Sequence, residues 1–470
     1  MKQTKRRFET LSFYDHTGIE AHLEKMARQG WMVESISNFG WVYRRIEPKQ
    51  LRFSVTYYPK ASEFDPEPSQ SQQTFHDFCA HTGWKLAATW AQMQVFYNEE
   101  KDPVPIETDP VMEVETLHRA AKKNYLISYF ALMLLALLNG GLFITGCLGD
   151  PIYQLSRTTH LFTGGVLVML LFMTATELIV YFTWRARAKK AAERGVFLPT
   201  PSTAKLQKVD LAVTLLLFVY WVIDLIFTGD AMMHWVFALA FAQMALLIFL
   251  VNTIKVQLKR RKVSRGVNRT ITLAACFVLS FVLMGALVQG MLYAVNNGVF
   301  EQGEQIYEYR GSTRVLYQDD LPLTVEEMVE TVPEAYTRRW TVNQSLLLGH
   351  AEARQWERLD WEGERLKDLE YTVTLVKAPF LYDLCKRDLF DKLDETKDDR
   401  IPEGYKLVYL SQDPVPWGAE EVYGIYNQQY PDHAYHWYLL CYADRIIEIK
   451  FDWEPTAEHM ALVAERLGSS

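Results

Sequence analysis

Five long apolar segments dominate the pattern of hydrophobic and polar positions along the chain. They cover about residues 125–147, 159–184, 209–228, 232–254 and 270–295, and they contain few ionised residues. Each is close to the ~20 residues that a helix needs to cross the hydrocarbon core of a bilayer. Because lipid offers no partner for backbone N–H and C=O groups, these segments are predicted to be α-helices. We therefore expect a multi-pass protein of the cell membrane with a five-helix transmembrane region at 125–295.

The charges of the connecting loops predict the orientation of these helices. Residues 185–208 hold seven basic residues and one acidic residue, and residues 255–269 hold seven basic residues and no acidic one. The alternate loops are poor in positive charge, since 148–158 contains only Arg157 and 229–231 contains no basic residue. Loops rich in Lys and Arg stay in the cytoplasm. The N-terminus is therefore expected to be cytoplasmic and the C-terminus, after five crossings, extracytoplasmic.

The region before the membrane block, residues 1–110, is predicted to be a cytoplasmic α+β domain built from two β-α-β-β repeats. The first repeat combines a strand over residues 7–14, a helix over 17–29 and a hairpin over 31–46. The second combines a strand over 52–58, a helix over 71–82 and a strand pair that ends near Tyr97. Gly30-Trp31 and Gly83-Trp84 mark the same place in the two repeats. A glycine is the usual residue where a helix must end in a left-handed turn.

The helices of this domain are expected to cover one face of an antiparallel sheet. A segment at 61–70 with Pro66 and Pro68 connects the strand and the helix of the second repeat. Residues 111–124 are predicted to be a linker or helix that continues into the first span.

The run from Leu23 to Trp31, Leu-Glu-Lys-Met-Ala-Arg-Gln-Gly-Trp, and the aromatic hairpin after it resemble a known family. The family is the bacterial domain of unknown function numbered 2812. The resemblance covers about residues 1–100 and implies a cytosolic module followed by membrane spans. It also implies a genetic neighbourhood that often includes PadR-type transcription regulators. It implies no reaction, since the family has none assigned.

Two acidic residues lie well inside the predicted spans, Glu177 in the second and Asp224 in the third. Charged residues in a membrane are costly and mark candidate functional sites. One interpretation is an ion or proton path that uses both carboxylates. Against it, the two residues lie toward opposite faces of the membrane, and no second carboxylate accompanies either one. Hydrogen bonding between helices is the alternative.

The last region, residues 296–470, is predicted to be an extracytoplasmic α+β domain. Strand patterns occur at 306–317, 369–377, 405–410, 421–427, 435–442 and 445–453, and helices are expected after Thr324, at 379–394 and at 456–467. Its 18 basic and 34 acidic residues argue against nucleic acid as a partner. Cys385 and Cys441 are the two cysteines placed outside, so they could form a disulfide or remain as buried thiols.

No motif for catalysis, a cofactor or a metal ion is present in the sequence. His433 and His436 are three residues apart, which in a strand places them on opposite faces. The expected partners are the lipid bilayer, a cytosolic regulatory protein at the N-terminal domain, and an extracellular ligand or protein at the C-terminal domain. The leading hypothesis is a membrane regulator or sensor without catalysis. An accessory component of transport or export, or a membrane-anchored enzyme with its site in the outer domain, remains open.

Overall fold

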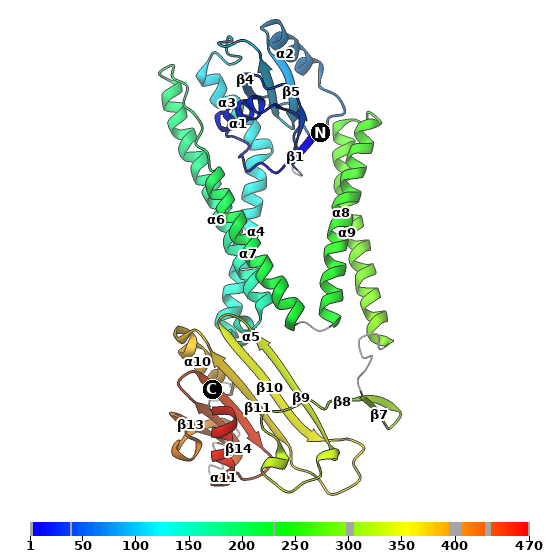
Figure 1. Ribbon diagram of the computed structural model, residues 1–470, viewed down its shortest axis with the longest axis vertical. Helices are drawn as coiled ribbons and strands as arrows, with labels where there is room; N and C mark the ends of the chain where they lie inside the picture. Colours follow the sequence, from blue (N-terminus) through cyan, green and yellow to red (C-terminus); the bar gives the residue numbers. More distant parts are fainter. Residues whose placement is uncertain are drawn as a thin grey trace. The chain divides into compact units, whose positions relative to one another are not determined.

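A computed structural model describes residues 3–37, 40–228, 231–297, 305–393, 406–427 and 434–468 (Figure 1). The chain divides into two compact units. The first comprises Met1–Asn139 and Gly165–Asn297, and the second comprises Gly140–Gly164 and Gly298–Ser470. Neither unit is a continuous piece of sequence, because residues 140–164 of the membrane region belong to the second unit while the residues on either side of them belong to the first.

The N-terminal part of the first unit contains two antiparallel three-stranded sheets. Their strand orders are β1-β3-β2 and β4-β6-β5. The elements are β1 (Thr4–Arg7), α1 (His16–Arg28), β2 (Trp31–Ser35), β3 (Trp41–Arg45), β4 (Arg52–Tyr57), α2 (Gln70–His81), β5 (Lys85–Trp90) and β6 (Met93–Asn98). The expectation of a single sheet is wrong, since β2 and β5 contact each other without pairing. Both strands carry a β-bulge, a feature that twists an edge and ends pairing.

The predicted strand over residues 7–14 is also wrong. The strand β1 ends at Arg7, and residues 8–15 are irregular until Asp15 caps α1 by accepting a hydrogen bond from the Gly18 amide at 3.0 Å. Phe13 and Tyr14 are neighbours in the sequence and both are buried, whereas a half-buried strand would bury only alternate residues. This irregular segment carries the residues that contact the membrane helices.

Gly30 and Gly83 occupy equivalent places after α1 and α2. Their φ angles are +82° and +84°, a conformation that suits residues without a Cβ. Trp84 is buried, as expected for a large side chain that follows such a turn. Trp31 is only half-buried, and its ring lies beneath the cations of Lys5 and Arg45 at 5.2 and 5.1 Å from the ring centre.

Five helices are long and apolar enough to cross a membrane, among the residues that the structure describes. They are α4 (Tyr125–Gly149), α6 (Thr158–Ala192), α7 (Ala204–Thr228), α8 (Ala231–Arg260) and α9 (Arg265–Asn296). The prediction of a multi-pass helical protein is thereby confirmed. A separate helix, α3 (Pro110–Lys123), precedes the first span, with Pro110 in its first turn and Asp109 as its cap. It ends at Asn124, so the polar helix does not continue unbroken into α4.

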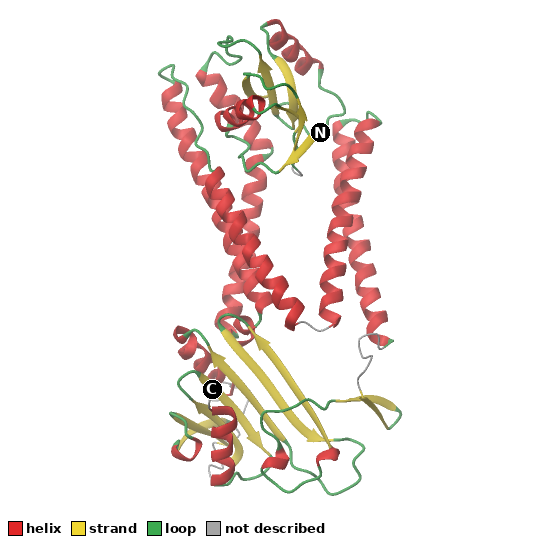
Figure 2. Cartoon of the chain, in the orientation of Figure 1, coloured by secondary structure: helices red, strands yellow, loops and turns green. Residues whose placement is uncertain are grey.

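A seven-stranded antiparallel sheet forms the centre of the second unit (Figure 2). Its order is β12-β13-β14-β15-β11-β10-β9. The strands are β9 (Tyr336–Gln344), β10 (Leu348–Glu357), β11 (Leu369–Val376), β12 (Leu407–Gln412), β13 (Glu421–Asn427), β14 (Ala434–Cys441) and β15 (Arg445–Phe451). The predicted hairpin across Ala443 and Asp444 is the pair β14–β15.

Both faces of this sheet are buried. Adjacent residues of β14 and β15 belong to two different apolar clusters, Leu439 and Ile446 to one and Leu440 and Ile447 to the other. Helix α11 (Ala457–Val463) adds Val463 to the second cluster. Helix α10 (Tyr382–Leu393) and the short α5 (Pro151–Ser156) add residues to the first. The loop between the first two membrane helices is therefore part of the C-terminal unit.

Two predictions in this unit need correction, and three elements were not predicted. Residues 306–317 form a hairpin, β7 (Gln305–Tyr309) and β8 (Ser312–Leu316), because Arg310 and Gly311 both adopt positive φ and make a tight turn. The helix expected after Thr324 is one 3₁₀ turn, Val325–Glu327. The strands β9 and β10 and the helix α5 have no counterpart in the sequence-based prediction.

Substituting Gly30 tests the turn that ends α1. A Cβ there would lie 2.9 Å from the carbonyl oxygen of Ile46, and the φ of +82° is unfavourable for alanine. We expect Gly30→Ala to lower the free energy of unfolding by about 1–2 kcal/mol. Thermal unfolding of the solubilised chain measures the change. Gly141→Ala is the control, because nothing lies within 4 Å of its added Cβ; equal melting temperatures for the two variants would contradict the assignment.

Candidate functional site

The carboxylate of Glu177 lies at the centre of a buried polar network in the first unit. Glu177 belongs to α6 and is 1% exposed. It accepts hydrogen bonds from Ser12 Oγ at 2.7 Å, Gln207 Nε2 at 2.8 Å and Tyr125 Oη at 3.0 Å, and also from Thr203 Oγ1. Burying a carboxylate costs free energy unless its oxygens are hydrogen-bonded. These four donors meet that requirement.

The four donors come from three separate parts of the chain. Ser12 lies in the irregular segment before α1, Tyr125 begins α4, Thr203 directly precedes α7, and Gln207 lies in the first turn of α7. Ser12 Oγ also lies 2.8 Å from Thr203 Oγ1 and accepts from Gln207 Nε2 at 2.9 Å. One carboxylate thus connects the N-terminal domain with three membrane helices.

A second set of hydrogen bonds holds the connection between α6 and α7 against the start of α1. Thr200 Oγ1 donates to the fully buried Asp15 at 2.8 Å, and the Thr200 amide donates to Thr17 Oγ1 at 3.0 Å. The Thr17 amide in turn donates to Thr200 Oγ1 at 3.3 Å. The three side chains fix the loop 193–203 on the N-terminal domain, beside the Glu177 network.

Aromatic side chains surround the network and exclude water from it. The ring of Tyr14 lies 5.2 Å from Tyr181, 5.5 Å from Tyr125 and 6.3 Å from Trp184. Trp184 Nε1 donates to the Pro199 carbonyl at 3.1 Å. These residues belong to one apolar cluster that also contains strands of the N-terminal domain and residues of α3, α4 and α6. Burial raises the pKa of Tyr14, so its hydroxyl stays protonated at physiological pH.

Helix α3 joins the same arrangement through His118. One ring nitrogen of His118 lies 2.8 Å from the hydroxyl of Tyr181 in α6. Burial, and the nearby charges of Arg185 and Lys122, lower the pKa of His118 to about 4. The imidazole is therefore neutral at pH 7, and the contact is a hydrogen bond between neutral groups.

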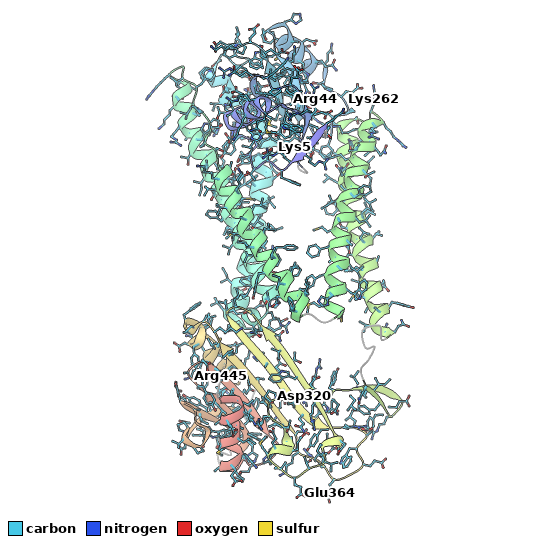
Figure 3. All side chains as sticks on the ribbon, in the orientation of Figure 1. Lys5, Arg44, Lys262, Asp320, Glu364 and Arg445 are labelled. Carbon is cyan, nitrogen blue, oxygen red and sulfur yellow. The ribbon has the colours of Figure 1, made fainter. Side chains whose placement is uncertain are left out.

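The segment 61–70, which connects β4 to α2 within the second repeat, makes a second contact with membrane helices. Its acidic side chains pair with basic residues at the ends of α8 and α9. The pairs are Glu63–Lys255 at 3.3 Å, Asp65–Arg265 at 3.0 Å and Glu67–Lys262 at 2.7 Å, with Lys262 labelled in Figure 3. Asn268 Nδ2 donates to the Phe64 carbonyl at 3.3 Å. Exposed ion pairs contribute about 0–1 kcal/mol each, so this contact is weaker than the buried network.

The structure does not bring Asp224 to Glu177. Asp224 lies in α7, 17 residues beyond Gln207, which corresponds to about 25 Å along a helix. The two carboxylates therefore belong to different sites. Of the two interpretations of Glu177, hydrogen bonding to other elements agrees with its contacts.

Cys385 and Cys441 are free thiols in the structure and do not form a disulfide there. Both are buried in one apolar cluster of the second unit. Burial raises the pKa of each thiol to about 11. Because the thiolate is the reactive form, two such side chains behave as small apolar residues.

No cluster of three or more His, Cys, Asp or Glu side chains that could hold a metal ion exists within the described ranges. His436 lies in β14, and His433 lies outside the described residues.

Residues 15–130 match the family model described as "Protein of unknown function (DUF2812)". This segment belongs to that family. The DUF2812 region is about a quarter of the chain and runs from the cap of α1 into the first membrane helix, further than the residues 1–100 of the resemblance. It contains Tyr125 but not Ser12, Glu177 or Thr203. No curated protein and no solved structure matches the chain.

Sequence reasoning found Glu177 but missed its partners. Ser12 lies 165 residues away and Thr203 lies 26 residues away. The run Pro199-Thr200-Pro201-Ser202-Thr203, hydroxyl-rich and directly before a span, was the signal that could have suggested a polar contact.

Removing the Glu177 carboxylate tests the network. Glu177→Ala leaves four buried donors without their acceptor, and each such loss costs about 1–3 kcal/mol. We expect the melting temperature of the solubilised chain, followed by tryptophan fluorescence, to fall by about 5 °C or more. Glu193→Ala, at an exposed position just beyond α6, is expected to change nothing. A Glu177 variant as stable as the Glu193 variant would show that the network does not hold the domain.

Proposed function

We propose that this chain is an integral membrane regulatory or sensor-like protein that links an extracytoplasmic domain to a cytoplasmic interaction domain without catalysis. The observation that carries the proposal is the Glu177 network. Its donors come from the N-terminal domain and from the starts of α4 and α7, while its acceptor lies in α6. A change in the packing of these helices would alter the hydrogen bonds that hold the N-terminal domain against them.

The second unit offers the other end of this link. Residues 140–164, which include the end of α4 and the start of α6, belong to the same compact unit as the C-terminal sheet. Ser345 Oγ donates to the Leu155 carbonyl at 2.6 Å, and Thr158 Oγ1 donates to the Gln344 carbonyl at 3.0 Å. Ligand binding that shifts β9 or β10 would therefore act directly on α5 and on the start of α6.

The orientation follows the basic loops. Seven basic residues in 185–208 and seven in 255–269 favour a cytoplasmic N-terminus and an extracytoplasmic C-terminus. In this orientation the N-terminal domain would bind a cytosolic regulatory protein, and a PadR-type regulator is the first candidate from the family resemblance. The C-terminal domain would bind an extracellular ligand or protein.

The N-terminal domain is proposed to be a duplicated β-α-β-β unit. Three observations support this. Its two sheets have the same strand order, Gly30 and Gly83 have the same positive φ, and each bulge begins three residues after its glycine, at Val33 and at Leu86. A duplicated module with two similar surfaces suits binding to a symmetric partner.

Labelling of introduced cysteines tests the orientation. Glu364→Cys and Glu47→Cys both introduce a thiol at an exposed position, one in each flanking domain. We expect a membrane-impermeant maleimide to label Glu364→Cys in intact cells, and to label Glu47→Cys only after permeabilisation. The unsubstituted chain measures the background from its native thiols. Labelling in the reverse order would overturn the orientation and the assignment of partners.

Hydrogen exchange tests the link between the two ends. Because α4 and α6 contribute residues to both units, Glu177→Gln is expected to speed amide exchange at 8–15 and also at α5, residues 151–156. Lys262→Ala, which removes the exposed pair with Glu67, is the matched control and is expected to affect only segment 61–70. Faster exchange that stays confined to the first unit in Glu177→Gln would contradict transmission through these helices.

A further inference from the structure

A cavity of about 420 Å³ lies along the outer edge of β4 in the N-terminal domain. Among the residues that the structure describes, β4 pairs with β6 alone, so its second edge is not part of a described sheet. The other walls come from α1, the segment 103–107, the start of α3 and residues 197–199. This volume is in the range of small-molecule sites, and none of the functions considered above uses it.

Four carboxylates line the cavity, and two of them are already paired. Glu24 lies 3.5 Å from Arg52, and Glu113 lies 3.3 Å from His16 Nε2. The other two are Glu20 and Glu107, and neither has an ion-pair partner within the described part of the chain. Glu20 Oε1 accepts one hydrogen bond, from the Val55 amide at 2.8 Å. The cavity therefore has an excess of negative charge.

Two polar atoms of the lining residues add an independent observation. Thr56 is 2% exposed and His16 is 8% exposed, and both line the cavity. The hydroxyl of Thr56 and Nδ1 of His16 have no hydrogen-bond partner among the described residues. Buried polar groups in native proteins are normally paired, so these atoms point to a missing partner. The Thr56 hydroxyl can accept a hydrogen bond, as can the carboxylate of Glu20, whereas Nδ1 of His16 accepts one only when the ring is neutral.

The remaining lining is largely apolar and includes four aromatic residues. Phe53, Tyr57, Trp84 and Phe197 contribute apolar surface. The polar ends of two of them are already used, since Tyr57 Oη donates to the Phe13 carbonyl at 2.6 Å and Trp84 Nε1 donates to the Val104 carbonyl at 2.8 Å. Aromatic surface next to uncompensated carboxylates suits a cation with an apolar body.

Burial explains why a proton competes for the Glu20 carboxylate near neutral pH. Desolvation raises the pKa of Glu20 to about 7, although His16 and the Val55 amide act in the opposite direction and Glu113 and Glu24 add to the rise. Burial, then the charges of Glu113 and Asp109, also raise the pKa of Glu107. A bound cation would favour the ionised form of both.

We propose that this cavity binds a small organic amine, with its ammonium group at Glu20 and Thr56 and its apolar body against Phe53, Trp84 and Phe197. The amine supplies donors that match the unpaired acceptors, and its charge offsets Glu20 and Glu107. This site goes beyond the proposed function. Amine binding depends neither on the orientation of the chain in the membrane nor on its protein partners, so it can be tested separately.

Calorimetry on the full chain in zwitterionic nanodiscs tests the proposal, with empty nanodiscs subtracted. The probes are tryptamine, its neutral counterpart tryptophol and the anionic indole-3-propionate. We expect tryptamine to bind at least tenfold more tightly than tryptophol and indole-3-propionate not to bind. Equal affinity for tryptamine and tryptophol, or no saturable heat with tryptamine at millimolar concentration, would overturn it.

Variants locate the site. Glu20→Gln is expected to weaken tryptamine binding at least tenfold, and Glu107→Gln, the second variant should Glu20→Gln fail to fold, at least threefold. Glu115→Gln is the matched control, because Glu115 is exposed on the same helix as Glu113 and does not line the cavity. Affinity that falls equally in the Glu107 and Glu115 variants would place the amine elsewhere.

The pH dependence supplies a further readout. Because a proton competes with the amine for Glu20, lowering the pH from 8 to 5.5 is expected to weaken binding roughly tenfold or more. Protonation of His16, whose pKa is raised by its pairing with Glu113 against the effect of burial, acts in the same direction. The dependence should persist in Glu115→Gln and flatten in Glu20→Gln; an identical pH profile in both variants would contradict the role of Glu20.

Discussion

A carboxylate buried among membrane helices is the constraint on which the first unit depends. Glu177 cannot be accommodated in an apolar helix bundle unless its oxygens are hydrogen-bonded, and its four donors all lie outside its own helix. The donors instead come from the N-terminal domain and from the starts of α4 and α7. The irregular segment before α1 also allows the neighbouring residues Phe13 and Tyr14 to be buried together, whereas a strand would turn them to opposite faces.

The two contacts between the N-terminal domain and the membrane helices differ in kind. The contact at Glu177 is buried, aromatic and hydrogen-bonded, whereas the contact of segment 61–70 with α8 and α9 rests largely on exposed ion pairs such as Glu67–Lys262. Salt screens exposed pairs, while buried hydrogen bonds are little affected. The domain therefore has one firm attachment to α4, α6 and α7 and one adjustable attachment to the α8–α9 hairpin.

The membrane helices were predictable because a run of about 20 apolar residues matches the length of helix that crosses the hydrocarbon core of a bilayer. The helices after Asp15 and Ser69 and the turns at Gly30 and Gly83 were predictable from local signals. The strands β9 and β10 were not, because Tyr336–Gln344 and Leu348–Glu357 contain many polar residues and acquire their structure by pairing with each other and with β11. Glu177 could be identified as unusual, but its partners depend on contacts over 26 to 165 residues that no local pattern records.

The short helix α5 gives the chain a fixed order of assembly. Its residue Leu155 binds Ser345, 190 residues later in the sequence. Ribosomes add about 5–20 residues per second, so α5 waits roughly 10–40 s for β10 to be made. During that interval Ile152 and Leu155 have no apolar cluster to enter, because the strands and the helix α10 that bury them do not yet exist. The loop between the first two spans thus completes its packing only after the C-terminal strands have been made.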